Sequence, residues 1–408
     1  MISRSFVFRT LALAAVLAAA APLAAQLAVR GETVYTMAGE PISDGVVLVR
    51  DGKIERVGPA SEVSIPSGYK ALRAKVVTPG LIDAHTVVGL AGYLNQNHDQ
   101  DQLERSTAMQ PELRAIDAYD ARERLVEWLR NLGVTTIHTG HGPGALISGQ
   151  TMIVKTTGRS AEEDVIIPEA MVAATLGPGA RGRDGKSPGT RAKAVAMLRG
   201  ELIKAQEYLR KREKAEEGKE PARNLRLEVL GRVLEGELPL LVTVNRIQDI
   251  LTAIRVGREF NLKLVLDSAA EAYLELDRIK ASGYPVILHP TMRRSSGEYE
   301  NLSFETAAKL RDAGILFALQ SGYESYVPKT RVVLFEAALA AANGLGSEDA
   351  LAAITIDAAR ILGVADRIGS LEAGKDADIA LFDGDPFEYT THCTGVVIDG
   401  RVVSEQPR

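Results

Sequence analysis

The stretch VVTPGLIDAHTVVGL, residues 76–90, decides the fold class of this chain. A turn signal at residues 78–80 leads into a short apolar run that ends in Asp83 and His85. A buried strand whose last residues are polar is typical of a parallel β/α barrel, because the active sites of such barrels lie at the carboxyl ends of the strands. The stretch therefore predicts the first strand of a barrel, with His85 at its mouth.

Helical patterns and short apolar runs alternate through residues 79–369. Each helical pattern ends at or near Gly or Asn, as helix C-termini favour. This alternation predicts an α/β fold with a parallel barrel. The clearest pairs are ARERLVEWLRNLG with VTTIHTG, RIQDILTAIRVGREFN with LKLVLDS, EAYLELDRIKASG with YPVILHP, and FETAAKLRDAG with ILFALQS.

A charged segment at residues 181–223 interrupts this alternation. It contains LIKAQEYLRKREKAEEGKEP and is flanked by Gly and Pro. Its mixed charges indicate a solvated helical insertion. Binding of a partner is the alternative role for this segment.

The segments before and after the predicted barrel, residues 26–78 and 370–408, do not show the alternation of helices and strands. Residues 26–78 and 370–408 contain short segments in which apolar and polar residues alternate, separated by turn signals such as Asp-Gly. These features predict short strands joined by hairpin turns. We expect a chain of 408 residues to form a barrel with a smaller β unit attached.

Residues 1–25 have the layout of a secretory signal peptide. Arg4 and Arg9 precede the Ala-rich apolar run LALAAVLAAAAPLAA, and small residues end this run before Gln26. A membrane anchor is the alternative, but it needs roughly 20 apolar residues and this run is shorter. No later segment is long and apolar enough to span a membrane. We therefore expect a secreted or periplasmic protein that has no membrane span after cleavage.

The composition limits the classes of partner and of site. The formal net charge is -5 and the chain has no basic patch with interleaved aromatic residues, which argues against a nucleic-acid partner. The single cysteine, Cys393, excludes an intramolecular disulfide and a Cys-rich zinc site. A zinc-type site would therefore need imidazole and carboxylate ligands.

Two motifs resemble the amidohydrolase superfamily, in particular its exported imidazolonepropionase-like subgroup. TPGLIDAH resembles the first barrel strand of that superfamily, and GSLEAGKDADIALFDGDP resembles its C-terminal segment. The resemblance implies a distorted (β/α)8 TIM barrel at residues 79–369 beside a small β-sandwich that residues 26–78 and 370–408 form together. It also implies hydrolysis of C–N bonds in non-peptide or cyclic amides. Divalent ions such as zinc would activate the water and polarise the carbonyl.

The resemblance also assigns metal ligands to six positions at the strand ends, and five of these positions carry another residue here. His85 is the retained ligand. Neighbouring residues such as Arg246, Asp249 and Glu271 still match the superfamily. The replaced positions are Val87 for a histidine on the first strand, Pro178 for a glutamate on the third, Asn245 and Ser268 for histidines on the fifth and sixth, and Gly322 for an aspartate on the eighth.

Loss of five ligands in a preserved scaffold favours a catalytically degenerate amidohydrolase homologue. We assign it no catalytic residue, no cofactor-binding residue and no bound cofactor. Such a protein would act as a binding or partner subunit, in a homo-oligomer or in a hetero-oligomer with an active amidohydrolase relative. Capture of a small-molecule ligand in the barrel mouth is the alternative role.

An active amidohydrolase with a rebuilt metal site is the other hypothesis. Of the six histidines, His85, His138, His141 and His289 fall at predicted strand ends. Three imidazoles can hold zinc or copper with one position open. Polar residues line the mouth of any barrel, however, and alternation along a strand directs the rings of His138 and His141 apart.

Overall fold

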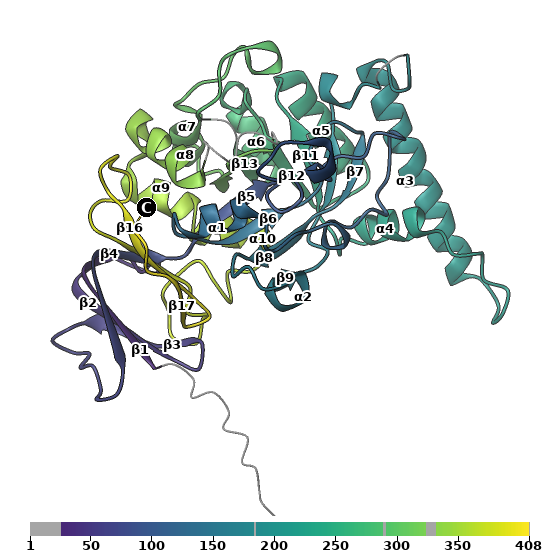
Figure 1. The fold of residues 1–408 in the computed structure, drawn as a ribbon. Coiled ribbons are helices and arrows are strands. Elements are labelled where there is room, and N and C mark those ends of the chain that lie inside the picture. Colours follow the sequence, from purple (N-terminus) through teal and green to yellow (C-terminus); the bar gives the residue numbers. More distant parts are fainter. Residues whose placement is uncertain (1–25, 183–184, 289–290, 324–331, 408) are drawn as a thin grey trace, which may run out of the picture.

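A computed structural model describes residues 26–182, 185–288, 291–323 and 332–407 (Figure 1). The predicted signal peptide, residues 1–25, and the candidate ligand His289 lie outside these described residues. Figure 1 shows a β-rich unit that contains both ends of the described chain, and a larger unit of strands and helices. In the part of the chain that the structure describes, no helix is both long and apolar enough to cross a membrane.

The β-rich unit is a seven-stranded sheet built from both ends of the chain. β15 pairs antiparallel with β4, with Ile379 opposite Pro79, and Val77 and Val397 pack in the same apolar core. A sandwich, with a second sheet packed on the first, stays a prediction. In spatial order the strands are β17 (Arg401–Ser404), β16 (Cys393–Ile398), β15 (Ile379–Phe382), β4 (Lys70–Pro79), β1 (Leu27–Val34), β2 (Ile42–Arg50) and β3 (Lys53–Pro59).

The larger unit contains two sheets in which most neighbouring strands are parallel. β5 pairs with β6, and β10 to β14 form a continuous parallel series. The sheets approach each other beside β5, where Thr86 forms a parallel bridge with Gly322. The strands are β5 (Leu81–Thr86), β6 (Val134–Thr139), β8 (Met152–Lys155) and β9 (Val165–Ile167) in one sheet, and β14 (Phe317–Leu319), β13 (Val286–Leu288), β12 (Leu264–Ser268), β11 (Leu240–Val244), β10 (Val172–Thr175) and β7 (Ile147–Gln150) in the other.

β7 and β8 depart from the regular helix–strand repeat that the sequence predicts. β8 runs antiparallel to β6, and β7 runs antiparallel to β10, so the chain passes from one sheet to the other at Thr151. The Thr151 N–H donates to the Met171 carbonyl at 2.9 Å. The unit is therefore an α/β structure with an antiparallel segment, and its closure into a complete barrel stays a prediction.

Helices lie against the strands of the larger unit (Figure 1). α5 is amphipathic, since Ile250, Ala253 and Ile254 are buried at helical spacing. α6 and α10 are followed by Gly283 and Gly363 in the left-handed conformation that glycine tolerates. The helices are α1 (Arg124–Arg130), α2 (Ala161–Asp164), α3 (Arg191–Glu213), α4 (Leu225–Leu234), α5 (Ile247–Glu259), α6 (Leu276–Ser282), α7 (Thr306–Asp312), α8 (Val333–Ala340), α9 (Ser347–Ala353) and α10 (Ile356–Leu362). Short 3-10 helices lie at Asn97–Asp99, Ala115–Asp117, Pro178–Ala180, Ala272–Leu274 and Gly297–Tyr299, and a π-helical turn lies at Ala341–Leu345.

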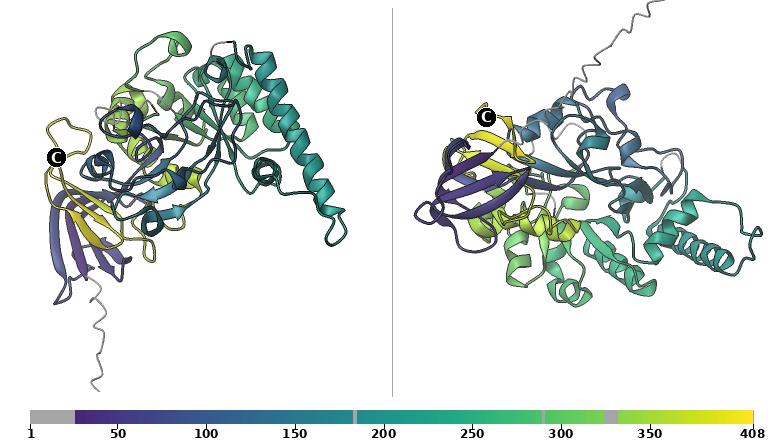
Figure 2. Two further views of the ribbon diagram at one scale, coloured as in Figure 1. Left: turned by 45° about the vertical axis from the view of Figure 1, so that its right-hand side comes forward. Right: turned by 90° about the horizontal axis from the view of Figure 1, so that it is seen from below.

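The predicted charged insertion contains α3, which Figures 1 and 2 show extending away from the strands of the larger unit. Thr190 caps the helix by accepting a hydrogen bond from the Lys193 N–H at 3.2 Å. Leu202 and Tyr208 are buried, and the Tyr208 hydroxyl donates to Glu228 of α4 at 3.1 Å. The helix is therefore solvated on one side only.

Gly80 joins the seven-stranded sheet to the larger α/β unit. Its N–H donates to the Asp378 carbonyl at 2.9 Å. A Cβ atom placed on Gly80 would lie 2.1 Å from Thr135 Oγ1 of β6. Because any side chain would clash there, the turn before β5 needs glycine to pass this close to β6.

Candidate functional site

Buried polar side chains from several strands meet at the carboxyl ends of β5, β6, β12 and β14. His85 is 1% exposed, and His138 and Asp267 are 0% exposed. The carboxyl ends of parallel strands lie at one end of a barrel, so residues from separate sequence motifs come together here. The cluster consists of Asp83, His85, His138, Asp267, Ser268, Gln320 and Ser321.

His85 is hydrogen-bonded to a buried carboxylate. Its Nδ1 lies 2.9 Å from Asp267 Oδ1. Because a carboxylate only accepts, Nδ1 carries the proton and Nε2 presents a lone pair. Nε2 is buried and has no hydrogen-bond partner among the described residues. His85 therefore has one ring nitrogen engaged and one that can accept a hydrogen bond.

Asp267 accepts three hydrogen bonds. Besides His85, Gln320 Nε2 donates to Oδ1 at 2.7 Å and the Thr243 hydroxyl donates to Oδ2 at 2.6 Å. Burial would raise the pKa of Asp267, but the neighbouring His85 ring and these hydrogen bonds hold it below its ordinary value. Asp267 thus stays ionised, and both of its oxygens already have donors.

Asp83 forms a second bonded group with Ser321. The Ser321 N–H donates to Asp83 Oδ1 at 3.0 Å, and the Ser321 hydroxyl donates to Oδ2. Burial raises the pKa of Asp83 to about 6, although hydrogen bonds from Ser321 and His85 oppose the shift. This group ties β5 to the segment that follows β14.

Both ring nitrogens of His138 are engaged. Nδ1 lies 2.7 Å from the Ala84 carbonyl, and Nε2 lies 2.6 Å from Thr151 Oγ1. Burial, with a smaller effect of His85, lowers the pKa of His138 to about 3, so the ring is neutral. A carbonyl only accepts, so Nδ1 donates to it and the Thr151 hydroxyl donates to Nε2. Neither nitrogen has a lone pair left for a metal in this arrangement.

His141 is buried in a separate place. Burial lowers its pKa to about 4, and neither ring nitrogen has a hydrogen-bond partner among the described residues. A Cβ atom on Gly149 would lie 2.2 Å from His141 Cδ2, so the ring packs on a glycine backbone. By contrast, the rings of His85 and His138 are neighbours, with centroids 5.7 Å apart.

The five replaced positions do not supply metal ligands. Val87 is fully buried and carries only carbon, and Pro178 begins a 3-10 helix. Asn245 Oδ1 accepts from the Ser268 hydroxyl at 2.7 Å, and the Gly322 N–H donates to the His85 carbonyl at 3.4 Å. Across the described ranges, no group of three or more His, Cys, Asp or Glu is arranged to hold a metal ion. Among the described residues, the side chains at these positions therefore offer no convergent set of ligands for the divalent ion that the resemblance implies.

Residues that still match the superfamily hold the surrounding loops. Glu271 accepts from the Ile247 N–H at 2.7 Å and from Asn301 Nδ2 at 2.8 Å, and it pairs with Arg246 at 3.1 Å. These contacts serve the scaffold, so they can persist while the ligand positions change.

Thr243 and Gln320 are contributors that sequence reasoning missed. Thr243 lies opposite Asp267 in the parallel pairing of β11 with β12. Two polar residues at equivalent positions of successive buried strands are a signal that could have indicated Thr243. Gln320 follows β14, and nothing local in its sequence indicates Asp267 as its partner.

Comparison with known proteins agrees with this architecture. The Amidohydrolase family matches residues 299–404. The chain is similar to an amidohydrolase from Thermotoga maritima MSB8 of known crystal structure, with 30% identity, a TM-score of 0.88, and 93% of this chain and 100% of that chain covered. It is 25% identical to an imidazolonepropionase from Brucella anthropi, over 84% of this chain and 87% of that protein. It is also 25% identical to the amidohydrolase tasK from Hapsidospora irregularis, over 89% of this chain but only 40% of that protein.

Proposed function

The chain belongs to the amidohydrolase superfamily, and we propose that it is an exported binding or partner subunit that is silent as a metal-dependent C–N hydrolase. Superfamily chemistry needs a divalent ion to generate hydroxide near neutral pH and to polarise the scissile carbonyl. The observation that carries the proposal is the hydrogen bonding around His85 and Asp267.

A divalent ion of the zinc type needs several lone pairs that converge on one point. Asp267 already accepts from three donors, and Asn245 and Ser268 bond to each other. Val87 has no lone pair at all. In this proposal, hydrogen bonds within the protein take the place of metal–ligand bonds, and they stabilise the same strand ends without a metal ion.

The barrel mouth keeps one feature that suits a ligand. His85 Nε2 is a buried acceptor without a partner in the described chain, and an unsatisfied buried acceptor costs about 1–3 kcal/mol. A ligand with an N–H group would satisfy it. A small amide is the class that we propose, in keeping with the relatives named imidazolonepropionase.

Metal analysis of the mature protein tests the proposal. Protein purified without chelator should contain well below one equivalent of zinc, iron, manganese or copper, and reconstitution should not change this value. His392 is the matched control, because its side chain is 54% exposed and can collect adventitious metal. One metal per chain that is lost in His85→Ala but kept in His392→Ala would refute the proposal and favour a rebuilt site.

Two further measurements separate the partner role from the ligand role. Purification of the native protein from its source should return an active amidohydrolase relative if the chain is a partner subunit, and recovery of this chain alone would count against that role. A small cyclic amide that raises the melting temperature of the wild type, but not of His85→Ala, would support the ligand role.

A further inference from the structure

A cleft of about 1000 Å³ lies where the seven-stranded sheet meets the barrel. Arg130, which lines it, precedes the amino end of β6, and Thr157 follows β8, which runs antiparallel to β6. The cleft is therefore at the amino ends of the barrel strands, away from His85. Two tight turns form its opposite wall, since a Cβ atom on Gly400 would lie 2.9 Å from Gly52 Cα.

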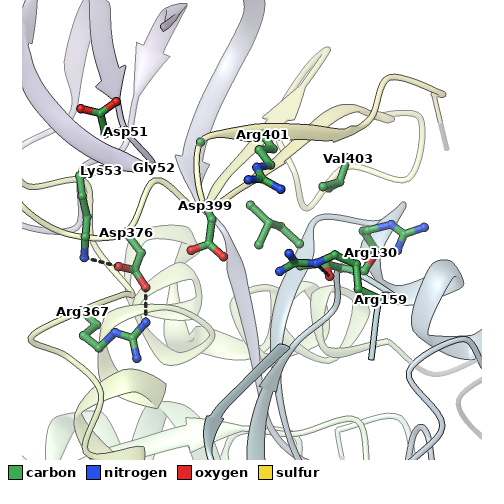
Figure 3. A pocket seen from close by; sticks show the side chains of 13 residues that line it. Asp51, Gly52, Lys53, Arg130, Arg159, Arg367, Asp376, Asp399, Arg401 and Val403 are labelled. Carbon is green, nitrogen blue, oxygen red and sulfur yellow. Dashed lines mark hydrogen bonds and ion pairs between the residues drawn. The ribbon is translucent and has the colours of Figure 1, made fainter. Parts of the chain in front are cut away.

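Most charges on one side of the cleft are neutralised within the protein. Lys53 and Arg367 both pair with Asp376, at 2.5 and 2.9 Å, as the dashed lines in Figure 3 show. Asp399 pairs with the buried Lys155. Lys155 also pairs with Asp378, so the three cations of this group are matched by three carboxylates and leave no excess charge for a ligand.

Arg130 and Arg401 are different, because neither forms an ion pair with a carboxylate in the described chain. Arg130 Nη1 donates to the Thr156 and Thr157 carbonyls at 3.0 and 2.9 Å, while its Nε is buried without an acceptor. Asp51 is the remaining acid of the lining, and Figure 3 places it across the cleft from Arg130. This half of the cleft is therefore cationic.

Apolar surface lies beside these cations. Val403 lies near Arg401 in Figure 3, and Ile398 also lines the cleft. A guanidinium group binds carboxylates and phosphates through paired N–H donors. A cavity of this volume is within the range of small-molecule sites.

We propose that this cleft binds a small organic anion, a carboxylate or phosphate group with an apolar part, through Arg130 and Arg401. The anionic group lies between the two guanidinium groups. The apolar part lies on Ile398 and Val403. This site is independent of the barrel mouth and of the function proposed for it.

Isothermal titration calorimetry of the mature wild-type protein at low ionic strength tests this site with three probes: inorganic phosphate, acetate and hexanoate. We expect saturable binding that matched sodium chloride does not reproduce. Hexanoate should bind at least about tenfold more tightly than acetate, because its chain buries several methylene groups. Arg401→Gln should weaken the binding of the preferred anion about tenfold or more, since a hydrogen bond to a charged group is lost.

Arg56→Gln is the matched control, because Arg56 is an exposed arginine on β3 outside the cleft. It should leave all affinities unchanged. Arg401 is exposed at the sheet edge, so its variant should fold even if Arg130→Gln does not. Absence of saturable binding for every probe would overturn the proposal, as would equal affinities in Arg401→Gln and Arg56→Gln. If hexanoate binds no more tightly than acetate, the proposed contact of an apolar group with Ile398 and Val403 is wrong. If phosphate binds more tightly than acetate, the site prefers a phosphate group. If acetate binds more tightly than phosphate, the site prefers a carboxylate.

Discussion

Replacing Lys155 with Met should destabilise the protein by about 3–5 kcal/mol, because the change leaves a buried carboxylate without its cation. Lys155 ends β8, and its side chain is 4% exposed. Its Nζ lies 2.9 Å from Asp376 Oδ2 and 3.1 Å from Asp378 Oδ2, and it also pairs with Asp399. One cation from the barrel thus holds three carboxylates at the seven-stranded sheet.

Removal of the Lys155 charge affects the three carboxylates to different extents. Asp376 keeps its pairs with Lys53 and Arg367, at 2.5 and 2.9 Å. Asp399 is 42% exposed, so water can solvate it. Asp378 is 4% exposed, and within the described chain no other cation pairs with it. The penalty for an unpaired buried charge therefore applies once, to Asp378.

The destabilisation should depend on pH. Burial raises the pKa of Asp378, and Lys155 opposes that shift. Without Lys155 the pKa of Asp378 rises further, so the folded state takes up a proton more readily than the unfolded chain as the pH falls. The penalty is therefore full at about pH 8 and smaller at about pH 5.

Urea unfolding followed by circular dichroism measures this effect. Lys70→Met is the matched control, because Lys70 pairs with Glu405 at 3.1 Å in an exposed position of the same sheet, and such pairs contribute at most about 1 kcal/mol. The double variant Lys155→Met with Asp378→Asn should recover part of the loss. A loss in Lys155→Met no larger than in Lys70→Met would refute this account of the junction.

Three further variants test other parts of the structure by the same unfolding measurement. Burial lowers the pKa of His141 to about 4, so its contribution is full above pH 6.5 and is lost as the pH falls through 4. In the wild type, the shifted pKa of His141 should lower the free energy of unfolding by about 3 kcal/mol between pH 6.5 and 4, and His141→Gln should remove this decrease. A free energy of unfolding that depends on pH in the same way in both proteins would contradict this. Gly80→Ala should cost about 1–3 kcal/mol through its clash with Thr135, and a neutral result would show that the turn can move. Thr243→Val removes a donor from buried Asp267 and should cost about 1–3 kcal/mol, and a stability equal to that of the wild type would contradict this.

Much of the α/β architecture was predictable because its signals are local. The turn at residues 78–80 and the apolar run after it predicted a strand, and β5 spans Leu81–Thr86. The helix that precedes each of four predicted strands is present, as α1, α5, α6 and α7. The antiparallel pair β7 and β8 was missed, because short apolar runs look alike whichever direction the strand takes.

The candidate site was likewise predictable only in part from the sequence. The resemblance to the superfamily predicts that Val87, Asn245 and Ser268 replace ligands, but the hydrogen bond between Asn245 and Ser268 is visible only in the structure. His138 was predicted as a candidate ligand of a rebuilt site. Its two hydrogen bonds, to Ala84 and Thr151, appear only when β5 and β8 flank β6.

The sequence alone establishes that residue 87 offers no side-chain lone pair to a metal, because a valine side chain contains only carbon and hydrogen in any fold. It also determined the positions of turns and helix ends, since these depend on residues close together in the chain. The partners of His85 and Lys155 are visible only in the folded protein, because Asp267 and Asp376 lie 182 and 221 positions away in the sequence. Such pairs depend on strand register and on how the sheet meets the barrel, and burial in that arrangement sets the charge state of each group.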